Sequence, residues 1–342
     1  MRPCLDRPHA AGPRPVHARA GRMSHATSET APLPGETYSP PVPRHLISID
    51  QVDDQLAREI FATADDMAAA LRIPTRLSSL TGRVVALLFF EPSSRTILSF
   101  SAAAARLGAA VISHRGVESS SLSKGESIED TIRVVGSYAD LIVLRHEAAG
   151  IAQRASEISP VPLINGGDGH NEHPTQALID MYTIERELGR LHSLRVGMGF
   201  DPRHSRSIHS LCRGLSHYTD NDVLLVGPEE LWLDERELSE LRAQGLRVRQ
   251  SSDMQELLAR EVVYVNRFQV ERIADPELAA TYRERYCIAA ADVRGSEVKL
   301  LLDPLPRIHE IAQDVDDLPE ALYFKQAANG VPIRMALLSM LA

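Results

Sequence analysis

The chain has 342 residues, of which 44% are hydrophobic and 24% charged, and its formal net charge is -9 at pH 7. These values are typical of a globular protein with room for two domains, and they exclude binding to nucleic acid or an anionic membrane through an extended basic surface. No apolar run approaches the roughly 20 residues needed to cross a bilayer. Cys4, Cys212 and Cys287 have no paired spacing, which favours reduced thiols and a cytoplasmic location.

Residues 1–44 differ in composition from the rest of the chain. They are rich in proline, arginine, alanine and histidine and show no hydrophobic period, so we expect a disordered extension. Residues 1–22 contain few acidic side chains, but they also lack an apolar segment, so a secretory signal is not expected. The prolines oppose a targeting helix as well. Met23 is an alternative start to Met1.

From about His45 onward, apolar strand patterns alternate with helical ones. Such alternation predicts parallel sheets with helices packed on them. A connector at 188–193 marks the expected boundary between two domains. The expected strands are 84–90, 110–114, 141–144, 161–164, 195–198, 223–226, 246–248, 262–265 and 298–302. The expected helices include 52–71, 128–138, 149–158 and 174–188. Two further helices are expected, one that follows the first strand and ends at 107 and one that ends at 218. The segments 320–324 and 330–341 close the chain.

A polar turn of sequence Glu-Pro-Ser-Ser-Arg-Thr, residues 91–96, follows the first expected strand. Ser93 and Ser94 are typical of a helix N-terminus, where backbone N–H groups lack helical partners. Arg95 adds a fork of donors at the same place. Hydroxyls, N–H groups and a guanidinium at a helix N-terminus suit a phosphate dianion. An ordinary serine cap beside a surface arginine explains this stretch alone equally well.

Polar residues also follow two later strands. Arg145 comes after 141–144, and the segment 165–176 comes after 161–164. Ligands of open parallel sheets bind beyond the carboxyl ends of the strands, so these residues are candidates for a site. His173 and Gln176 are three residues apart at the start of a helix and therefore share a face. The alternative for His173 is a capping or core histidine, and the polar segment around 118–126 could equally be a solvated loop.

Four separated motifs together resemble the aspartate and ornithine carbamoyltransferase family, and the aspartate branch most closely. Residues 91–96 resemble the carbamoyl phosphate signature, and 168–178 resemble the second signature. Residues 267–272 resemble the aspartate-binding segment, and 304–307 the loop that closes on both substrates. The Ser-Met-Gly signature of the ornithine branch is absent. The resemblance spans about residues 45–341.

The resemblance implies two α/β domains of similar size, each a doubly wound parallel sheet. Residues 45–188 are then the carbamoyl phosphate-binding domain, against which the last helix, 328–342, packs, and residues 189–327 are the amino-acid-binding domain. It also implies a homotrimer with active sites shared between subunits, and no metal or redox cofactor. A regulatory or dihydroorotase partner is possible. Nucleic acid and membrane partners are not implied.

The implied activity is transfer of the carbamoyl group of carbamoyl phosphate to the amino group of L-aspartate, with release of phosphate, in pyrimidine biosynthesis. Such a reaction needs donors aimed at a tetrahedral oxyanion and arginines for anionic substrates. The phosphate would be held by Ser93, Ser94, Arg95 and Thr96; the carbonyl oxygen by Thr96, Arg145 and His173; the carbamoyl amino group by Gln176 and the Leu305 backbone. The acceptor would be held by Arg206, Arg267, Gln269 and Pro306, with Ser120 or Ser121 and Lys124 reaching in from the adjacent subunit.

The sequence departs from the family pattern at several positions. Asp303 stands where histidine is usual, Glu172 where glutamine is usual, and Phe200 where glycine is usual. Ile97 stands where arginine is common, and Ser94 stands where threonine is usual, which is a mild change. Each extra carboxylate about 6 Å from a bound anion would cost on the order of 2–3 kcal/mol.

These departures leave three alternatives open. Either the carboxylates of Asp303 and Glu172 point away from the substrates, or the acceptor is a different amino acid, such as a diamino acid. The third alternative is a non-catalytic structural or regulatory relative. The retained side chains oppose that alternative: Arg95, Lys124, Arg145, His173 and Gln176.

Overall fold

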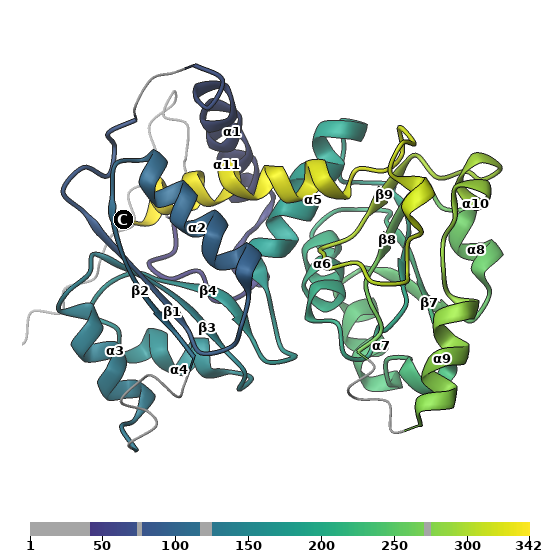
Figure 1. Cartoon of the computed structure of the whole chain (residues 1–342), viewed down its shortest axis with the longest axis horizontal. Helices are drawn as coiled ribbons and strands as arrows, with labels where there is room; N and C mark the ends of the chain where they lie inside the picture. Colours follow the sequence, from purple (N-terminus) through teal and green to yellow (C-terminus); the bar gives the residue numbers. More distant parts are fainter. Residues whose placement is uncertain (1–41, 74–76, 117–124, 270–274) are drawn as a thin grey trace, which may run out of the picture. The chain divides into compact units, whose positions relative to one another are not determined.

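The computed structural model describes residues 42–73, 77–116, 125–269 and 275–342 (Figure 1). It contains two wholly parallel sheets, one of four strands in the order β2-β1-β3-β4 and one of five in the order β7-β6-β5-β8-β9. The strands are β1 Val84–Phe89, β2 Ala110–Arg115, β3 Leu141–His146, β4 Leu163–Asp168, β5 Arg195–Gly199, β6 Asp222–Val226, β7 Arg247–Ser251, β8 Val262–Val265 and β9 Leu300–Leu302.

Helices connect these strands, as parallel pairing requires. They are α1 Asp54–Ala70, α2 Ser94–Arg106, α3 Ile128–Gly136, α4 Ile151–Ile158, α5 Pro174–Leu188, α6 Arg206–Ser216, α7 Glu235–Ala243, α8 Met254–Leu258, α9 Pro276–Arg285, α10 Ala290–Arg294 and α11 Tyr323–Leu341. A short 3-10 helix, η1, spans Ile49–Gln51.

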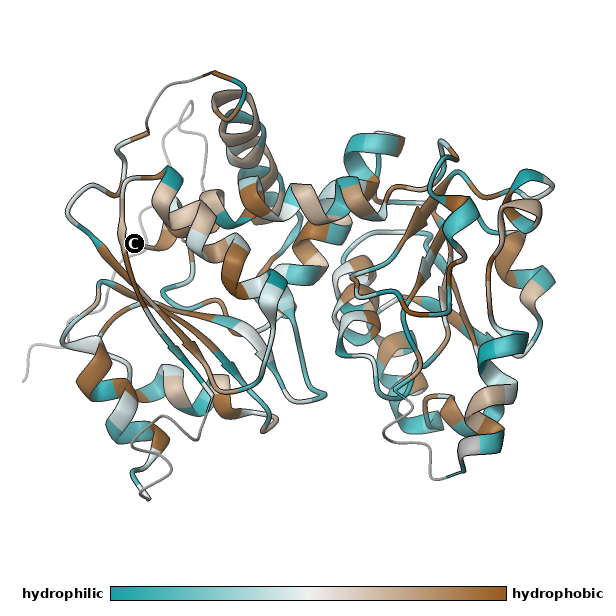
Figure 2. Ribbon diagram, in the orientation of Figure 1, coloured by the Kyte–Doolittle hydropathy of each residue, from teal (hydrophilic) through white to brown (hydrophobic). Residues whose placement is uncertain are grey.

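The first sheet is buried on both faces. In β1, Val85 and Leu87 pack in one core with α1, α2, α5 and α11, whereas Ala86 and Leu88 pack in another with α3 and α4. Successive side chains of a strand point to opposite faces, so a strand covered on both faces is apolar throughout. Figure 2 shows this as hydrophobic strands between helices with hydrophilic outer faces.

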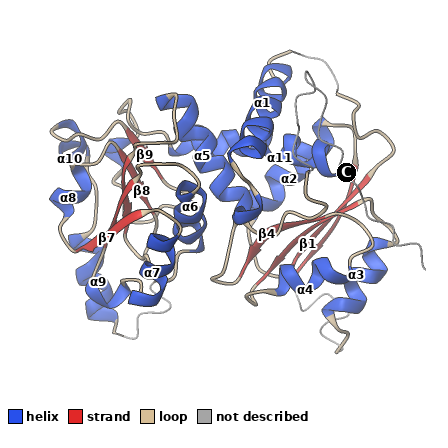
Figure 3. Cartoon of the chain, turned by 180° about the vertical axis from the view of Figure 1, so that it is seen from behind, coloured by secondary structure: helices blue, strands red, loops and turns tan. Residues whose placement is uncertain are grey.

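The second sheet follows the same rule. Val223 and Leu225 of β6 pack on the side of α6 and α7, whereas Leu224 and Val226 pack with residues of α8, α9 and α10. Figure 3 shows these helices around the second sheet from behind. Helices on both faces of two parallel sheets confirm the predicted doubly wound α/β fold.

Strand β4 begins and ends later than predicted. The prediction placed a strand at 161–164 and a loop from Asn165 onward, but residues 165–168 belong to the strand. Pairing with β3 explains the difference, since Asn165 lies opposite Leu144 and Asp168 opposite His146. Leu46 pairs with the start of the strand as well: Leu46 N donates to Leu163 O at 2.9 Å, and Asn165 N donates to Leu46 O at 2.8 Å. Two glycines lower strand propensity locally, so the continuation of the strand was not visible in the sequence.

Helix α11 is continuous, although two separate segments were predicted at the end of the chain. Pro332 lies inside it, and the helix is buried against α1, α2 and α5. Burial along several helices therefore outweighs the local cost of an interior proline. Within the described ranges, no helix is both long enough and apolar enough to cross a membrane.

The contact between α5 and α6 depends on a glycine. A Cβ at Gly214 would lie 2.5 Å from the Met181 sulfur and 3.2 Å from Ile49 Cγ1, and both neighbours are buried. Overpacking costs about 1–3 kcal/mol, which exceeds the gain of about 1 kcal/mol in helix propensity from alanine. We therefore expect Gly214→Ala to lower the melting temperature.

The control is Gly295→Ala, because a Cβ at that position meets no neighbouring atom. Thermal unfolding of both variants, followed by circular dichroism, checks the prediction. A melting temperature for Gly214→Ala equal to or above that of Gly295→Ala would contradict it.

Candidate functional site

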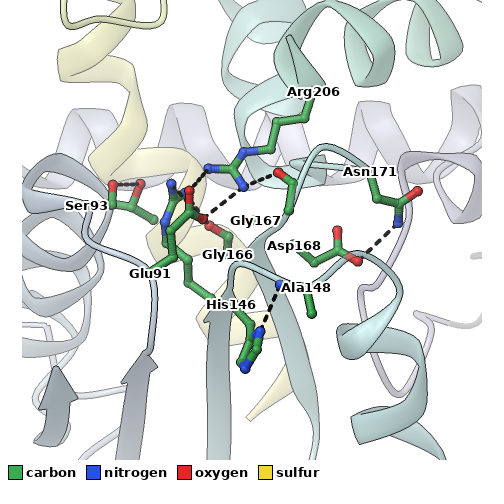
Figure 4. A network of polar contacts seen from close by, with 12 residues as sticks. Glu91, Ser93, His146, Ala148, Gly166, Gly167, Asp168, Asn171 and Arg206 are labelled. Carbon is green, nitrogen blue, oxygen red and sulfur yellow. Dashed lines mark hydrogen bonds and ion pairs between the residues drawn. The ribbon is translucent and has the colours of Figure 1, made fainter. Parts of the chain in front are cut away.

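One carboxylate, that of Glu91, holds two guanidinium groups at the carboxyl ends of the strands (Figure 4). Arg145 Nη2 lies 3.1 Å from Glu91 Oε2. Arg206 binds with both terminal nitrogens, Nη1 at 2.9 Å from Oε2 and Nη2 at 3.0 Å from Oε1. Because Arg145 ends β3 of the first sheet and Arg206 begins α6 after β5 of the second, Glu91 connects the ends of both sheets.

Arg145 reaches this position because β4 carries glycines beside it. Its Nη1 donates to the carbonyl of Gly166 at 3.1 Å, and a Cβ on Gly167 would lie 2.7 Å from the same nitrogen. Gly167 also has φ of +115°, where other residues are strained. Burial, together with the charge of Arg206, lowers the pKa of Arg145 to about 10, so it is still charged at neutral pH.

The turn that leads into α5 is fixed by Asp168. Its Oδ1 accepts from Asn165 Nδ2 at 3.0 Å and from the backbone N of Glu172 at 3.1 Å. Its Oδ2 accepts from the backbone N of Gly150 at 2.8 Å and from Asn171 Nδ2 at 3.0 Å. Four donors to one buried carboxylate fix the backbone of this turn, and the residue that follows it is His173.

His173 is the N-cap of α5, but its side chain makes no capping hydrogen bond. Its backbone N donates to Ser210 Oγ at 3.0 Å, which ties the start of α5 to α6. Burial and the charges of Arg145 and Arg206 lower the pKa of His173 well below its usual value. The imidazole is therefore neutral at physiological pH and can offer one donor and one acceptor nitrogen.

The predicted phosphate turn forms the start of α2. Ser93 is the N-cap, but its Oγ donates to Thr96 Oγ1 at 2.9 Å and does not cap the first turn. Ser94 is the first helical residue and, like Arg95, is exposed. Arg95 lies close enough to Arg145 to lower the pKa of Arg145, so a third guanidinium stands near the two that Glu91 holds, and Arg95 also interacts with Asp303.

Gln176 and Leu305, the two groups predicted to hold a carbamoyl amino group, each bind a carboxylate. Gln176 Nε2 donates to Asp180 Oδ1 at 2.7 Å. The backbone N of Leu305 donates to Asp303 Oδ1 at 2.5 Å, at a residue with φ of +59° that precedes a cis bond to Pro306. Positive φ in a residue other than glycine is strained and is common in functional loops.

The predicted acceptor residues lie on the loops after β5 and β8. Gln269 donates from its backbone N to Asp201 Oδ2 at 3.2 Å and from Nε2 to the carbonyl of His204 at 2.7 Å. His204 Nδ1 lies 2.9 Å from Asp201 Oδ1. Arg267 Nη1 donates to the carbonyl of Phe268 at 3.2 Å. Gln269 therefore packs on the loop that leads to Arg206, whereas Arg267 donates to its own chain neighbour.

Three predicted residues, Ser120, Ser121 and Lys124, lie outside the described residues. Among the residues that the structure does describe, no group of three or more His, Cys, Asp or Glu side chains is arranged to hold a metal ion.

The Glu172 departure from the family pattern does not add charge to this cluster. The carboxylate points to η1 and α6: Oε2 accepts from the backbone N of Ile49 at 3.0 Å, and Oε1 lies 2.9 Å from Arg213 Nη1. Phe200 is also accounted for, because its ring is fully buried and stacks on Phe268 in the core of the second sheet.

Asp303 is buried, with only 1% of its surface accessible to solvent. Burial and the neighbouring Glu310 raise its pKa well above the usual value, against the opposing charges of Arg95 and Arg307. A raised pKa favours the neutral acid relative to an exposed aspartate, which reduces the repulsion expected from the sequence. Of the two carboxylates thought to oppose anionic substrates, Glu172 is therefore ion-paired elsewhere, and Asp303 is buried with a raised pKa.

Sequence reasoning missed the partners of the predicted residues. Glu91 belonged to a recognised motif but received no role, although two arginines at strand ends need a counter-charge. Asp180 was also missed, and its signal was the four-residue spacing from Gln176, which places both on one helix face. Gln326 gave no local signal, since its partners are more than twenty residues away in the chain.

Two family models match the chain. The carbamoyl-P binding domain of aspartate/ornithine carbamoyltransferase matches residues 44–186, and the Asp/Orn binding domain matches residues 193–341. Among curated proteins, the aspartate carbamoyltransferase catalytic subunit of Methanocaldococcus jannaschii is 42% identical over 87% of this chain and 97% of its own length. That of Methanosarcina acetivorans is 44% identical over 87% and 96%.

Solved structures are also similar to this chain. The catalytic subunit of M. jannaschii aspartate transcarbamoylase matches with a TM-score of 0.82 and 42% identity, over 87% of this chain and 97% of that one. Aspartate transcarbamoylase of Trypanosoma cruzi in complex with N-(phosphonacetyl)-L-aspartic acid matches with a TM-score of 0.81 and 34% identity, over 87% and 95%. The chain belongs to the aspartate/ornithine carbamoyltransferase family.

Proposed function

We propose that this protein is an aspartate carbamoyltransferase that transfers the carbamoyl group of carbamoyl phosphate to L-aspartate, as a step in pyrimidine biosynthesis. The observation that carries the proposal is the cluster of Arg95, Arg145 and Arg206 around Glu91, with a neutral His173 beside it. Three cations and one anion leave a positive charge, which suits two anionic substrates meeting at one place.

The reaction follows from what these groups can do. The aspartate amine attacks the carbonyl carbon, and the bond between that carbon and the bridging phosphate oxygen breaks. Arg145, His173 and Thr96 would donate to the oxyanion that develops on the carbonyl oxygen, where each donor is worth a few kcal/mol. The phosphate leaves with the bonding electrons and takes up the amine proton. The N-terminus of α2, with Ser93, Ser94 and Arg95, would hold that phosphate throughout.

On the acceptor side, Arg206, Arg267 and Gln269 would bind the two carboxylates of aspartate, with Pro306 against the substrate. In the structure Arg206 is held by Glu91, so its guanidinium is already positioned before an acceptor arrives. Such preorganisation lowers the entropy cost of binding. The ion pairing of Glu172 and the raised pKa of Asp303 remove the main argument for a diamino acid as acceptor.

We also propose which part of the chain binds which substrate. Residues 45–188, with the end of α11, would bind carbamoyl phosphate, and residues 189–327 would bind the amino acid. The active unit would be a homotrimer in the cytoplasm, where Ser120 and Lys124 enter the site of the neighbouring subunit. The unpaired Cys212 and Cys287 support a reducing compartment.

The direct test incubates the protein with carbamoyl phosphate and, separately, L-aspartate, L-ornithine or 2,3-diaminopropionate, and identifies products by mass. We expect N-carbamoyl-L-aspartate and an equal amount of phosphate. A carbamoylated diamino acid without any carbamoyl aspartate would overturn the choice of acceptor, and no product with any amine would overturn the proposed activity.

Shared active sites can be tested by subunit mixing. We expect Lys124→Ala and Arg95→Ala proteins to be inactive separately, because each damages every site of its own trimer. After subunit exchange, some sites in mixed trimers would combine an intact Lys124 with an intact Arg95. Partial recovery of activity is expected, and its absence after exchange has been demonstrated by mass spectrometry would contradict sites built across subunits.

Replacement of Glu91 by glutamine tests the charge balance of the site. Glu91→Gln leaves Arg145 and Arg206 without their counter-charge, and loss of a partly buried charged partner typically costs about 2–5 kcal/mol. We expect kcat/KM to fall by about thirtyfold or more for both substrates.

The matched control is Glu129→Gln. The Glu129 side chain is 28% exposed, as is that of Glu91, and it also pairs with an arginine, Arg154. Its ion pair joins α3 to α4 and includes neither Arg145 nor Arg206, so the kinetic constants of the variant should stay within twofold of those of the wild type. Equal kinetic losses in both variants would mean that the Glu91 effect is not specific to this site.

A further inference from the structure

A buried chain of hydrogen bonds joins the two groups assigned to the carbamoyl amino group. Gln176 Nε2 donates to Asp180 Oδ1 at 2.7 Å, and Gln326 Nε2 donates to the same oxygen at 2.6 Å. The backbone N of Asp303 donates to Gln326 Oε1 at 2.9 Å, and Asp303 Oδ1 accepts from the backbone N of Leu305. The path therefore runs from the side chain of Gln176 on α5 to the backbone of Leu305 after β9.

Asp180 determines which way the Gln176 amide faces. The Asp180 side chain is fully buried, and its Oδ1 can only accept hydrogen bonds from the two amides that reach it. Each glutamine must therefore turn its Nε2 toward Asp180, and the Oε1 of Gln176 then lies on the opposite edge of its amide. An oxygen at that edge can accept a hydrogen bond from an N–H group, but it cannot donate one.

The Asp180 carboxylate is costly to retain at this position. Although the Tyr264 hydroxyl interacts with this carboxyl group, no donor among the described residues comes within hydrogen-bonding distance of its Oδ2, and burial raises the pKa of Asp180 to about 7. The buried Tyr264 hydroxyl and the Arg334 guanidinium are the other polar groups that face it. An apolar residue would fill this part of α5 without burying a polar group, so packing alone does not account for an aspartate here.

We propose that Asp180 is a positioning residue that makes the site select carbamoyl phosphate over other acyl phosphates. It fixes the Gln176 oxygen as an acceptor and, through Gln326 and Asp303, holds the Leu305 backbone in the same arrangement. The inference rests on the proposed function, because it assumes that an acyl phosphate occupies the site. Acetyl phosphate has a methyl group where carbamoyl phosphate has an amino group, so it would leave the partly buried oxygen of Gln176 without a donor.

The test measures dissociation constants of carbamoyl phosphate, acetyl phosphate and inorganic phosphate by calorimetry in the absence of any amine. For the wild type we expect carbamoyl phosphate to bind at least tenfold more tightly than acetyl phosphate. Asp180→Ala should weaken carbamoyl phosphate binding tenfold or more and leave acetyl phosphate and phosphate within about twofold. Asp180→Asn should retain the selectivity, because its Oδ1 accepts the same two bonds and its Nδ2 can donate to the hydroxyl oxygen of Tyr264, which interacts with the Asp180 carboxyl.

The matched control is Thr183→Val, one turn further along α5. Thr183 Oγ1 also binds α11, accepting from Asn329 Nδ2 at 2.9 Å, and it is also fully buried, but it makes no contact with Gln176. This variant should lose stability without losing selectivity. If Asp180→Ala does not fold, Gln326→Met is the second variant, since it removes both hydrogen bonds made by Gln326 at nearly constant volume.

The outcomes distinguish a failure of the inference about Asp180 from a failure of the proposed function. Equal losses for all three ligands in Asp180→Ala, or the same loss of selectivity in Thr183→Val, would reduce Asp180 to a structural role and overturn the inference. Unchanged selectivity in Asp180→Ala, or in Gln326→Met if the first variant is unfolded, would overturn it as well. Failure of the wild-type protein to bind carbamoyl phosphate would instead refute the proposed function.

Discussion

The Glu91 carboxylate is the group on which the arrangement of the site depends. Arg145 and Arg206 come from the two sheets and would repel each other if they met without it. At about 6 Å and an effective dielectric constant near 20, such repulsion is on the order of 3 kcal/mol. One carboxylate that accepts from both removes most of this cost and fixes both guanidinium planes. Because three arginines remain around one acid, the site keeps an excess of positive charge for its ligands.

Burial and the surrounding charges together shift the pKa values of two groups nearby. Burial and the arginines act in one direction on His173, so its imidazole is neutral. On Asp303 they act in opposite directions: burial and Glu310 raise the pKa, whereas Arg95 and Arg307 lower it, and the first pair dominates. The site therefore combines guanidinium groups and a neutral imidazole with one carboxylate, that of Glu91, which is paired with Arg145 and Arg206.

The fold was largely predictable because its signals are local or periodic. The apolar runs of β1, β3 and β8 and the Pro174 to Gly189 limits of α5 are signals of this kind. The extension of β4 was not predictable, because residues 165–168 pair with β3 although two glycines lower their strand propensity. The effect of burial on the pKa of Asp303 was not predictable either, because at the sequence level an aspartate counts as one negative charge regardless of its surroundings.

Single residues of the candidate site could be recognised from the sequence, but the hydrogen bonds that connect them could not. Motifs identified Gln176, Arg145 and Leu305, whereas Asp180 and Gln326 became visible only when α11 was placed against α5. Helix α11 starts after the second sheet and packs on α1, α2 and α5 of the first, so its first turns reach residues that are far apart in the chain.

Further along the same helix, Arg334 Nη1 donates to Ser99 Oγ on α2, the helix that begins with the phosphate turn. Its guanidinium also lies over the Phe100 ring at 4.9 Å from the centroid. Helix α11 thus contacts α2 through Arg334 and the loop after β9 through Gln326. A change in the position of α11 would move both contacts together. We infer that the accuracy of this site depends on the docking of α11 as much as on the motifs that carry its chemistry.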